Sequence, residues 1–119
     1  MSTSLSGRTV LIVEDEPLIA LDIATVFERA GATALTARTL ANARCLVERD
    51  GLAAAVLDFG LGDGDAEALC ARLNQRGIPF VLHSGYEHAG EACRSGIVIP
   101  KPANPDRLVD AVGHLLGRR

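Results

Sequence analysis

Polar side chains follow four of the short apolar segments in this chain of 119 residues. Clustered carboxylates repel one another and raise one another's pKa unless a cation lies among them. Oxygen ligands without a histidine or cysteine partner favour a hard divalent ion, chiefly Mg²⁺. A lysine and a hydroxyl beside such an ion suit the oxygens of a phosphate group. The residues that indicate this phosphate chemistry are Glu14, Asp15, Asp58, Ser84 and Lys101.

The elements that must position these residues alternate along the chain. Runs such as "VLIV" are apolar on both faces, which is typical of parallel strands covered by helices on two sides. Alternating strands and helices predict an α/β fold with a parallel sheet, right-handed crossovers and helices on both faces. Ligands of such sheets bind outside the carboxyl ends of the strands. The predicted strands are residues 9–13, 33–37, 53–57, 79–83 and 97–99.

Capping residues and glycines mark the predicted helices. We expect helices over residues 17–30, 39–50 and 66–76, and a last helix that begins at "NPDRL". The expected N-caps are Thr39, Asp65 and Asn104. The buried stripe of the first helix is predicted as Ile19, Ile23, Val26 and Ala30, and that of the last helix as Leu108, Val112 and Leu115.

Composition excludes several classes of protein. The chain has 12 basic and 15 acidic residues and no basic stripe, so direct binding to nucleic acid has little electrostatic support. No apolar run approaches the roughly 20 residues that span a bilayer, and we expect no membrane insertion. The N-terminal "MSTSLSG" does not resemble a signal peptide, and we expect a cytoplasmic location. No linker or repeat interrupts the chain, which predicts one domain over residues 1–119 with a flexible stretch at 1–7.

The cysteines and histidines form no sequence pattern that indicates a metal site. Cys45, Cys70 and Cys93 are far apart, and we interpret them as small core or half-buried residues in a reducing compartment. The histidines have no ligand-like pairing and are interpreted as structural or solvated; they are His83, His88 and His114.

A simpler interpretation exists for each polar residue taken alone. Acidic residues between a strand and a helix are often only helix caps, and we favour this interpretation for Asp63 and Asp65. For Glu14 and Asp15 it remains an open alternative. The convergence of several strand ends, rather than any single residue, favours a functional site.

Together these motifs resemble the receiver domain of two-component response regulators. The resemblance covers about residues 8–117 and rests on an ordered set of motifs. An acidic pair follows the first predicted strand, an aspartate closes the third, a Ser/Thr follows the fourth, and Lys-Pro follows the fifth. It implies a doubly wound, flavodoxin-like sheet of five parallel strands in the order 2-1-3-4-5. The glycines in "GYEHAGEACRSG" predict a fourth helix that is short or irregular.

The resemblance also implies a role for each site residue. Asp58 would accept a phosphoryl group from a sensor histidine kinase or a phosphotransfer protein. Ser84 and Lys101 would contact that group, and Gly85 would leave room for it. The implied ligands of Mg²⁺ are Asp15, Asp58, the backbone carbonyl of Gly60 and, through water, Glu14.

Three functions are compatible with this pattern. The first is a stand-alone receiver that is not an enzyme, beyond slow self-dephosphorylation, and that signals through altered binding to an unidentified downstream protein. The second is a pseudo-receiver that binds partners without being phosphorylated. The third is an aspartyl-phosphate phosphatase with Asp58 as nucleophile. That class places its nucleophile after the first strand with a second aspartate two residues on, where this chain has Gly60.

The chain departs from the receiver pattern near its C-terminal end. Val98 replaces an aromatic residue that normally moves inward on activation, so we expect the switch to run through residues 85–96, with Tyr86 coupled to Ser84. We also expect little packing to hold that segment. "PFVLHSGY" is similar to the signature of an atypical receiver subgroup with a reduced fourth helix. The resemblance further implies a cis peptide bond before Pro102.

Overall fold

The computed structural model describes residues 5–58, 66–84, 91–101 and 103–117. Five parallel strands form one sheet in the order β2-β1-β3-β4-β5, which confirms the predicted fold. Each strand lies within one or two residues of its predicted position because its apolar run is short and sharply bounded. The strands are β1 (Thr9–Val13), β2 (Thr33–Ala37), β3 (Leu52–Asp58), β4 (Phe80–Ser84) and β5 (Ile97–Pro100).

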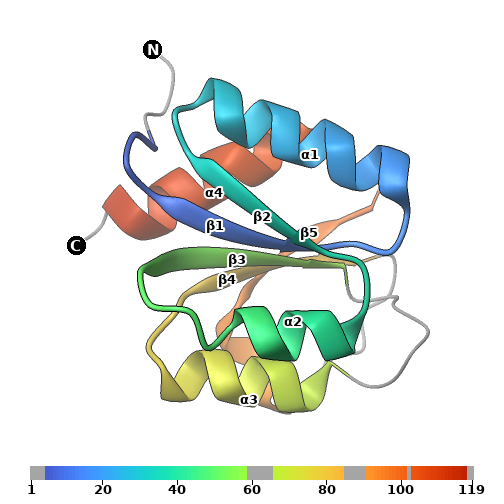
Figure 1. Ribbon diagram of the computed structural model, residues 1–119, viewed down its shortest axis with the longest axis vertical. Coiled ribbons are helices and arrows are strands. Elements are labelled where there is room, and N and C mark those ends of the chain that lie inside the picture. The colour runs from blue at the N-terminus through green and yellow to red at the C-terminus, as the bar shows by residue number, and fades with distance from the viewer. Residues whose placement is uncertain (1–4, 59–65, 85–90, 102, 118–119) are drawn as a thin grey trace.

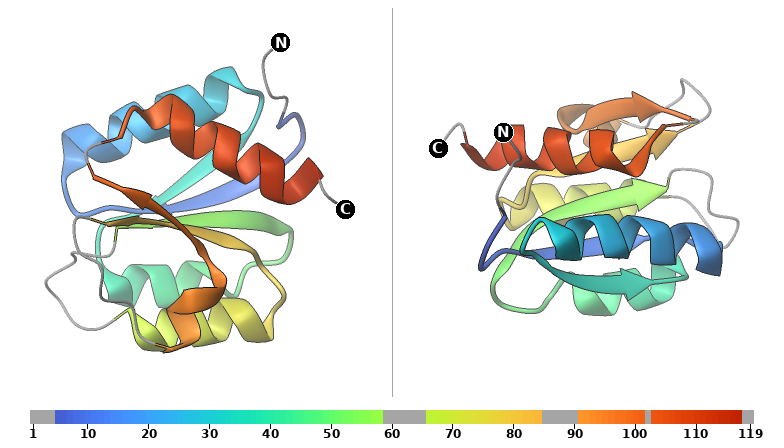
Figure 2. Two further views of the ribbon diagram at one scale, coloured as in Figure 1. Left: turned by 180° about the vertical axis from the view of Figure 1, so that it is seen from behind. Right: turned by 90° about the horizontal axis from the view of Figure 1, so that it is seen from above.

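Helices cover both faces of the sheet, as Figures 1 and 2 show. Helices α1 (Pro17–Arg29) and α4 (Pro105–Gly117) pack on one face, and α2 (Leu40–Leu46) and α3 (Glu67–Gln75) pack on the other. Alternate residues of the strands therefore enter two separate cores. Val56 of β3 lies in the core under α1 and α4, whereas Leu57 lies in the core under α2 and α3.

Helix α1 buries a face that agrees with the predicted one at Ile23 and, in part, at Val26 and Ala30, but not at Ile19. Its buried residues are Ala20, Ile23, Ala24 and Phe27, while Ile19 is 43% exposed. The prediction for Ile23 is confirmed and that for Ile19 is wrong. Phe27 is fully buried and fixes the orientation of the helix, because a large aromatic side chain gains more from burial than the smaller Val26.

The helix ends agree only in part with prediction. The Thr39 hydroxyl accepts a hydrogen bond from the Asn42 backbone at 3.0 Å, and the Asn104 side chain accepts one from the Asp106 backbone at 2.9 Å. Both residues are thus the helix caps that we expected. Helix α2 ends at Leu46 rather than at residue 50, because the chain turns there toward Gly51, which has a φ of +89°. Asp65 lies outside the described residues.

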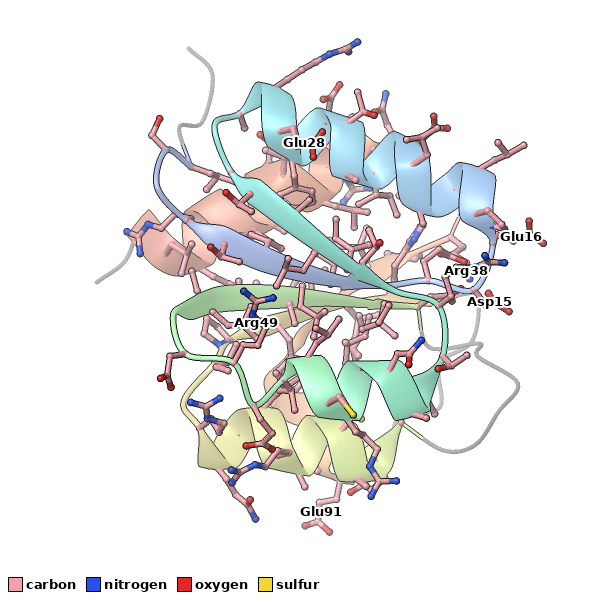
Figure 3. The ribbon with its side chains drawn as sticks, in the orientation of Figure 1. Asp15, Glu16, Glu28, Arg38, Arg49 and Glu91 are labelled. Carbon is pink, nitrogen blue, oxygen red and sulfur yellow. A yellow bond between two sulfur atoms is a disulfide. The ribbon has the colours of Figure 1, made fainter. Side chains whose placement is uncertain are left out.

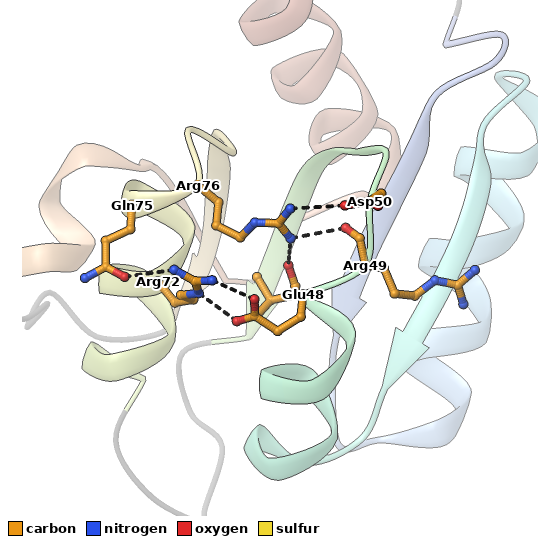
Figure 4. A network of polar contacts seen from close by, with 7 residues as sticks. Glu48, Arg49, Asp50, Arg72, Gln75 and Arg76 are labelled. Carbon is orange, nitrogen blue, oxygen red and sulfur yellow. Dashed lines mark hydrogen bonds and ion pairs between the residues drawn. The ribbon is translucent and has the colours of Figure 1, made fainter.

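Arg72 of α3 and Arg76, directly after α3, connect this helix to the residues that follow α2 (Figure 4). The Arg72 guanidinium donates two hydrogen bonds to the Glu48 carboxylate, at 2.6 and 2.7 Å, and thereby lowers the pKa of Glu48. Arg76 donates to the backbone carbonyl of Val47 at 2.6 Å. The Arg72–Glu48 pair is largely exposed, so it contributes little to stability and mainly sets the spacing of the two helices.

A 3₁₀ helix, η1 (Glu91–Ser95), takes the place of the fourth helix and confirms the expected short helical turn. It is more firmly packed than predicted, because it lies against α3 and is joined to it by a disulfide between Cys70 and Cys93. The interpretation of these two cysteines as unpaired core residues is therefore wrong, although both are fully buried. Cys45 is exposed and free. In the described part of the chain, no helix has the length and apolar character that a membrane crossing requires.

Candidate functional site

Four of the predicted site residues, Glu14, Asp15, Asp58 and Lys101, come together where the parallel strands end. Asp58 is the last residue of β3 and pairs in register with His83 of β4. Lys101 follows β5 directly, and Glu14 and Asp15 follow β1. Figure 3 shows Asp15 at the edge of the sheet where β1 leads into α1. The fold thus brings these strand ends to one edge of the sheet, as the sequence predicted.

Three carboxylates form an acidic cluster at this edge. Glu14, Asp15 and Asp58 each place a carboxylate oxygen within 4.8 Å of the others. Glu14 is 2% exposed and Asp58 is 5% exposed, whereas Asp15 faces solvent. Buried carboxylates so close together repel one another, and an all-oxygen set of this kind fits a hard divalent cation.

Glu14 is the most strongly perturbed member of the acidic cluster. Burial, followed by its hydrogen bond to Asp58, raises the pKa of Glu14 to about 8, against the opposing effect of a backbone hydrogen bond from Glu16. The Glu16 amide donates to Glu14 Oε2 at 3.1 Å, whereas Oε1 is buried and has no hydrogen-bond partner in the part of the chain that the structure describes. A buried acceptor without a donor is costly, and a cation or its bound water would satisfy it.

Lys101 supplies the positive charge beside the acidic cluster. Its ammonium donates a hydrogen bond to Asp58 Oδ1 at 2.5 Å, and the lysine side chain is about one-third exposed. The ion pair links the ends of β3 and β5 across β4. On β5, Val98 is 48% exposed and does not fill the interior space near the cluster.

His83 is a feature of the site that the sequence did not reveal. It is 7% exposed, and neither ring nitrogen has a hydrogen-bond partner among the described residues. It pairs in register with Asp58 on one side and Ile99 on the other, so its side chain lies on the same face of the sheet as both. Burial, and then the charge of Lys101, lowers the pKa of His83. Alternate residues of β4 point to opposite faces of a sheet that is covered on both sides, and this pattern could have indicated the burial of His83. His114, by contrast, is exposed.

We expect His83→Leu to raise the free energy of unfolding by about 1 kcal/mol, because it replaces an unsatisfied buried polar ring with an apolar side chain. Urea denaturation measures this change. The stability gained by the variant should grow below pH 6.5. The pKa of His83 is lower in the folded than in the unfolded protein, so the wild-type protein loses stability as the pH falls below the pKa of the unfolded state, whereas the variant does not. A variant less stable than wild type at every pH would contradict the interpretation.

Several predicted residues lie outside the part of the chain that the structure describes. They are Gly60, Asp63, Gly85, Tyr86, His88, Pro102 and the side chain of Ser84. Their predicted roles, including the cis peptide bond and the coupling of Tyr86 to Ser84, stay predictions.

Comparison with known proteins identifies the family. The sequence profile of the response regulator receiver domain matches residues 10–113, nearly the whole chain. This protein therefore belongs to the receiver domain family of two-component response regulators.

Solved structures agree on the fold. A CheY-like receiver domain protein from Methanospirillum hungatei JF-1 superposes with a TM-score of 0.82 at 24% identity, over 95% of this chain and 96% of that chain. The receiver domain of the Francisella response regulator 1452 gives a TM-score of 0.79 at 26% identity, over 93% and 98% of the two chains. No curated protein sequence matches the chain.

Proposed function

We propose that Asp58 accepts a phosphoryl group from a phosphohistidine of a sensor histidine kinase or phosphotransfer protein. A carboxylate oxygen of Asp58 attacks the phosphorus, the P–N bond breaks, and the histidine nitrogen leaves. The observation that carries the proposal is the position of Asp58, buried between two other carboxylates and the Lys101 ammonium. Phosphoryl transfer depends mostly on positioning and charge neutralisation, which this arrangement provides.

Mg²⁺ is the proposed cofactor. Asp15, Asp58 and the Gly60 carbonyl would hold it directly, and Glu14 would reach it through water. The unpartnered Glu14 Oε1 and the all-oxygen donor set support this choice. The ion would neutralise the charge on the transferred group. Lys101 would then move its hydrogen bond from Asp58 to a phosphoryl oxygen, and Ser84 would donate another.

The proposed output is a change in protein binding. Phosphorylation adds about −1.5 to −2 charges at Asp58, and the strand ends around it respond to that charge. The change would alter the affinity for a downstream protein in the cytoplasm. In this role the chain is a phosphoacceptor rather than an enzyme.

The test is mass spectrometry of the intact protein after incubation with a small acyl phosphate and Mg²⁺. We expect a mass gain of one phosphoryl group that disappears in Asp58→Asn and in excess chelator. Asp110→Asn is the matched control, an aspartate on α4 away from the acidic cluster, and it should be phosphorylated as wild type. Absence of any gain in the wild-type protein would favour a pseudo-receiver, and a gain that persists in Asp58→Asn would exclude Asp58 as the acceptor.

A further inference from the structure

The disulfide between Cys70 and Cys93 joins the middle of α3 to η1. Its two sulfur atoms are bonded, the Cα atoms are 5.0 Å apart, and 23 positions separate the residues in sequence. Neither cysteine is exposed to solvent. The proposed phosphoryl chemistry uses neither residue.

Besides the disulfide, η1 packs Ala92 against the core that contains α3, and exposed or partly buried hydrogen bonds join the two elements. The Ala92 amide donates to the Glu67 carboxylate at 2.8 Å, and the Asn74 side chain donates to the Ala92 carbonyl at 2.8 Å. Ser95 donates to the Asn74 side chain at 2.7 Å. Water competes for such bonds, and each contributes modestly to stability. The disulfide is therefore the strongest single connection between η1 and α3.

The chain after η1 is fixed independently of the disulfide. Gly96 packs so closely on Phe80 of β4 that a Cβ atom there would lie 2.6 Å from the Phe80 ring. The next residue, Ile97, is already paired with Val81. Loss of the disulfide would consequently leave β5 in place, and η1 would be held only by its hydrogen bonds and the packing of Ala92.

The fold does not need a disulfide. A domain of this size buries roughly two-thirds of its surface, and here two apolar cores lie on the two faces of the sheet. Disulfides that are dispensable for folding in proteins of reducing compartments are commonly transient or redox-sensing.

We propose that Cys70 and Cys93 form a reversible oxidation site, at which a thiol–disulfide couple fixes η1 to α3 when oxidised and releases it when reduced. The co-reactants are small thiols and disulfides of the glutathione class. The two cysteine thiols lose two electrons and two protons to a disulfide, which becomes two thiols. In the reverse direction a thiolate attacks one sulfur, the Cys70–Cys93 bond breaks, and a second thiol resolves the mixed disulfide.

The surroundings of Cys93 suit both states. Its Sγ lies 3.8 Å from the Ala66 carbonyl oxygen, which gives the reduced thiol an acceptor inside the protein. Because both sulfurs are shielded, exchange requires local opening of η1, and a single short 3₁₀ helix opens more easily than a sheet.

The inference goes beyond the proposed function and does not depend on phosphorylation of Asp58. Its consequence for signalling does rest on that function. Helix η1 precedes β5, which leads to Lys101, so the oxidation state would act on the connection between two strands of the proposed phosphoryl site.

The test uses the purified full chain, treated under native conditions with dithiothreitol or with glutathione disulfide. Alkylation and mass spectrometry count the free thiols, and amide hydrogen exchange reports on residues 91–95. In the oxidised form we expect Cys45 alone to carry an alkyl label or a glutathione, and in the reduced form all three cysteines to be alkylated, with the Cys70–Cys93 bond fully restored on oxidation. Exchange in 91–95 should be at least about tenfold faster after reduction, with β1 and β3 unchanged.

Two variants distinguish local release of η1 from unfolding of the whole chain. Cys93→Ser should reproduce the fast exchange of the reduced form with β1 and β3 still protected, whereas Cys45→Ser should keep both redox states. Labelling of Cys70 and Cys93 only in denaturant would overturn the proposal, as would failure to reform the bond. Equal exchange of 91–95 in the two states would overturn the release of η1.

Discussion

In the absence of divalent cations, we expect the free energy of unfolding to fall as the pH rises from about 4.5 to about 8. The cause is Glu14, whose pKa rises from 4.5 to about 8 in the folded protein, chiefly through burial. The folded state binds this proton more tightly than the unfolded state, so the Glu14 contribution to stability is full below pH 4.5 and is lost through this window. It outweighs the smaller contribution of His83, which has the opposite sign below pH 6.5. One pKa unit corresponds to about 1.4 kcal/mol, which makes the loss of the order of several kcal/mol.

Magnesium should restore most of this stability at high pH. The ion would place positive charge among the three carboxylates and favour the ionised form of Glu14. Urea denaturation at several pH values, with chelator or with Mg²⁺, measures both effects. Stability that rises with pH in chelator, or that does not respond to Mg²⁺ at pH 8, would contradict this account.

Glu14→Gln provides the matching variant. It removes the buried carboxyl while keeping a side chain of the same size, so the variant should lose most of the pH dependence and be more stable than wild type at pH 8 in chelator. Glu16→Gln is the control: Glu16 is exposed and only its backbone contacts Glu14. We expect the control to retain the wild-type pH dependence.

The sequence predicted the sheet well, because short apolar runs bounded by polar residues leave little freedom in placing strands. It predicted the rotation of α1 less well, since Ile19 and Ala20 are both apolar and only the packing of Phe27 decides which of them is buried. The Cys70–Cys93 pairing could not be predicted, because it depends on where η1 lies against α3.

The acidic cluster was predictable for a topological reason: carboxyl ends of neighbouring parallel strands meet at one edge, so Glu14, Asp15 and Asp58 had to converge. The burial of His83 was predictable from the alternation of β4, but its lack of a partner among the described residues was not, because buried polar groups are normally hydrogen-bonded. Local departures from general rules of this kind are expected at functional sites.

Removal of the Lys101 ammonium should lower the free energy of unfolding more than most other changes at the site. Lys101→Met keeps much of the aliphatic stem but leaves Asp58 buried beside Glu14 without its cation. Breaking a buried ion pair costs about 3–5 kcal/mol. Because Lys101 is about one-third exposed and water screens part of the charge, we expect a loss of about 1–3 kcal/mol in chelator. Urea denaturation measures this loss, and Mg²⁺ should reduce it by taking over the neutralising role.

A double-mutant cycle tests whether the loss comes from the Asp58 charge. In Asp58→Asn no charge needs the ammonium, so adding Lys101→Met should cost much less than it does in the wild-type background. Arg72→Met is the comparison for an exposed ion pair and should lower the free energy of unfolding much less than Lys101→Met does. If Lys101→Met costs the same in both Asp58 backgrounds, the lysine stabilises the fold through packing of its stem. The ion pair would then have no part in balancing the acidic cluster, and the role assigned to Lys101 in phosphoryl transfer would lose its electrostatic basis.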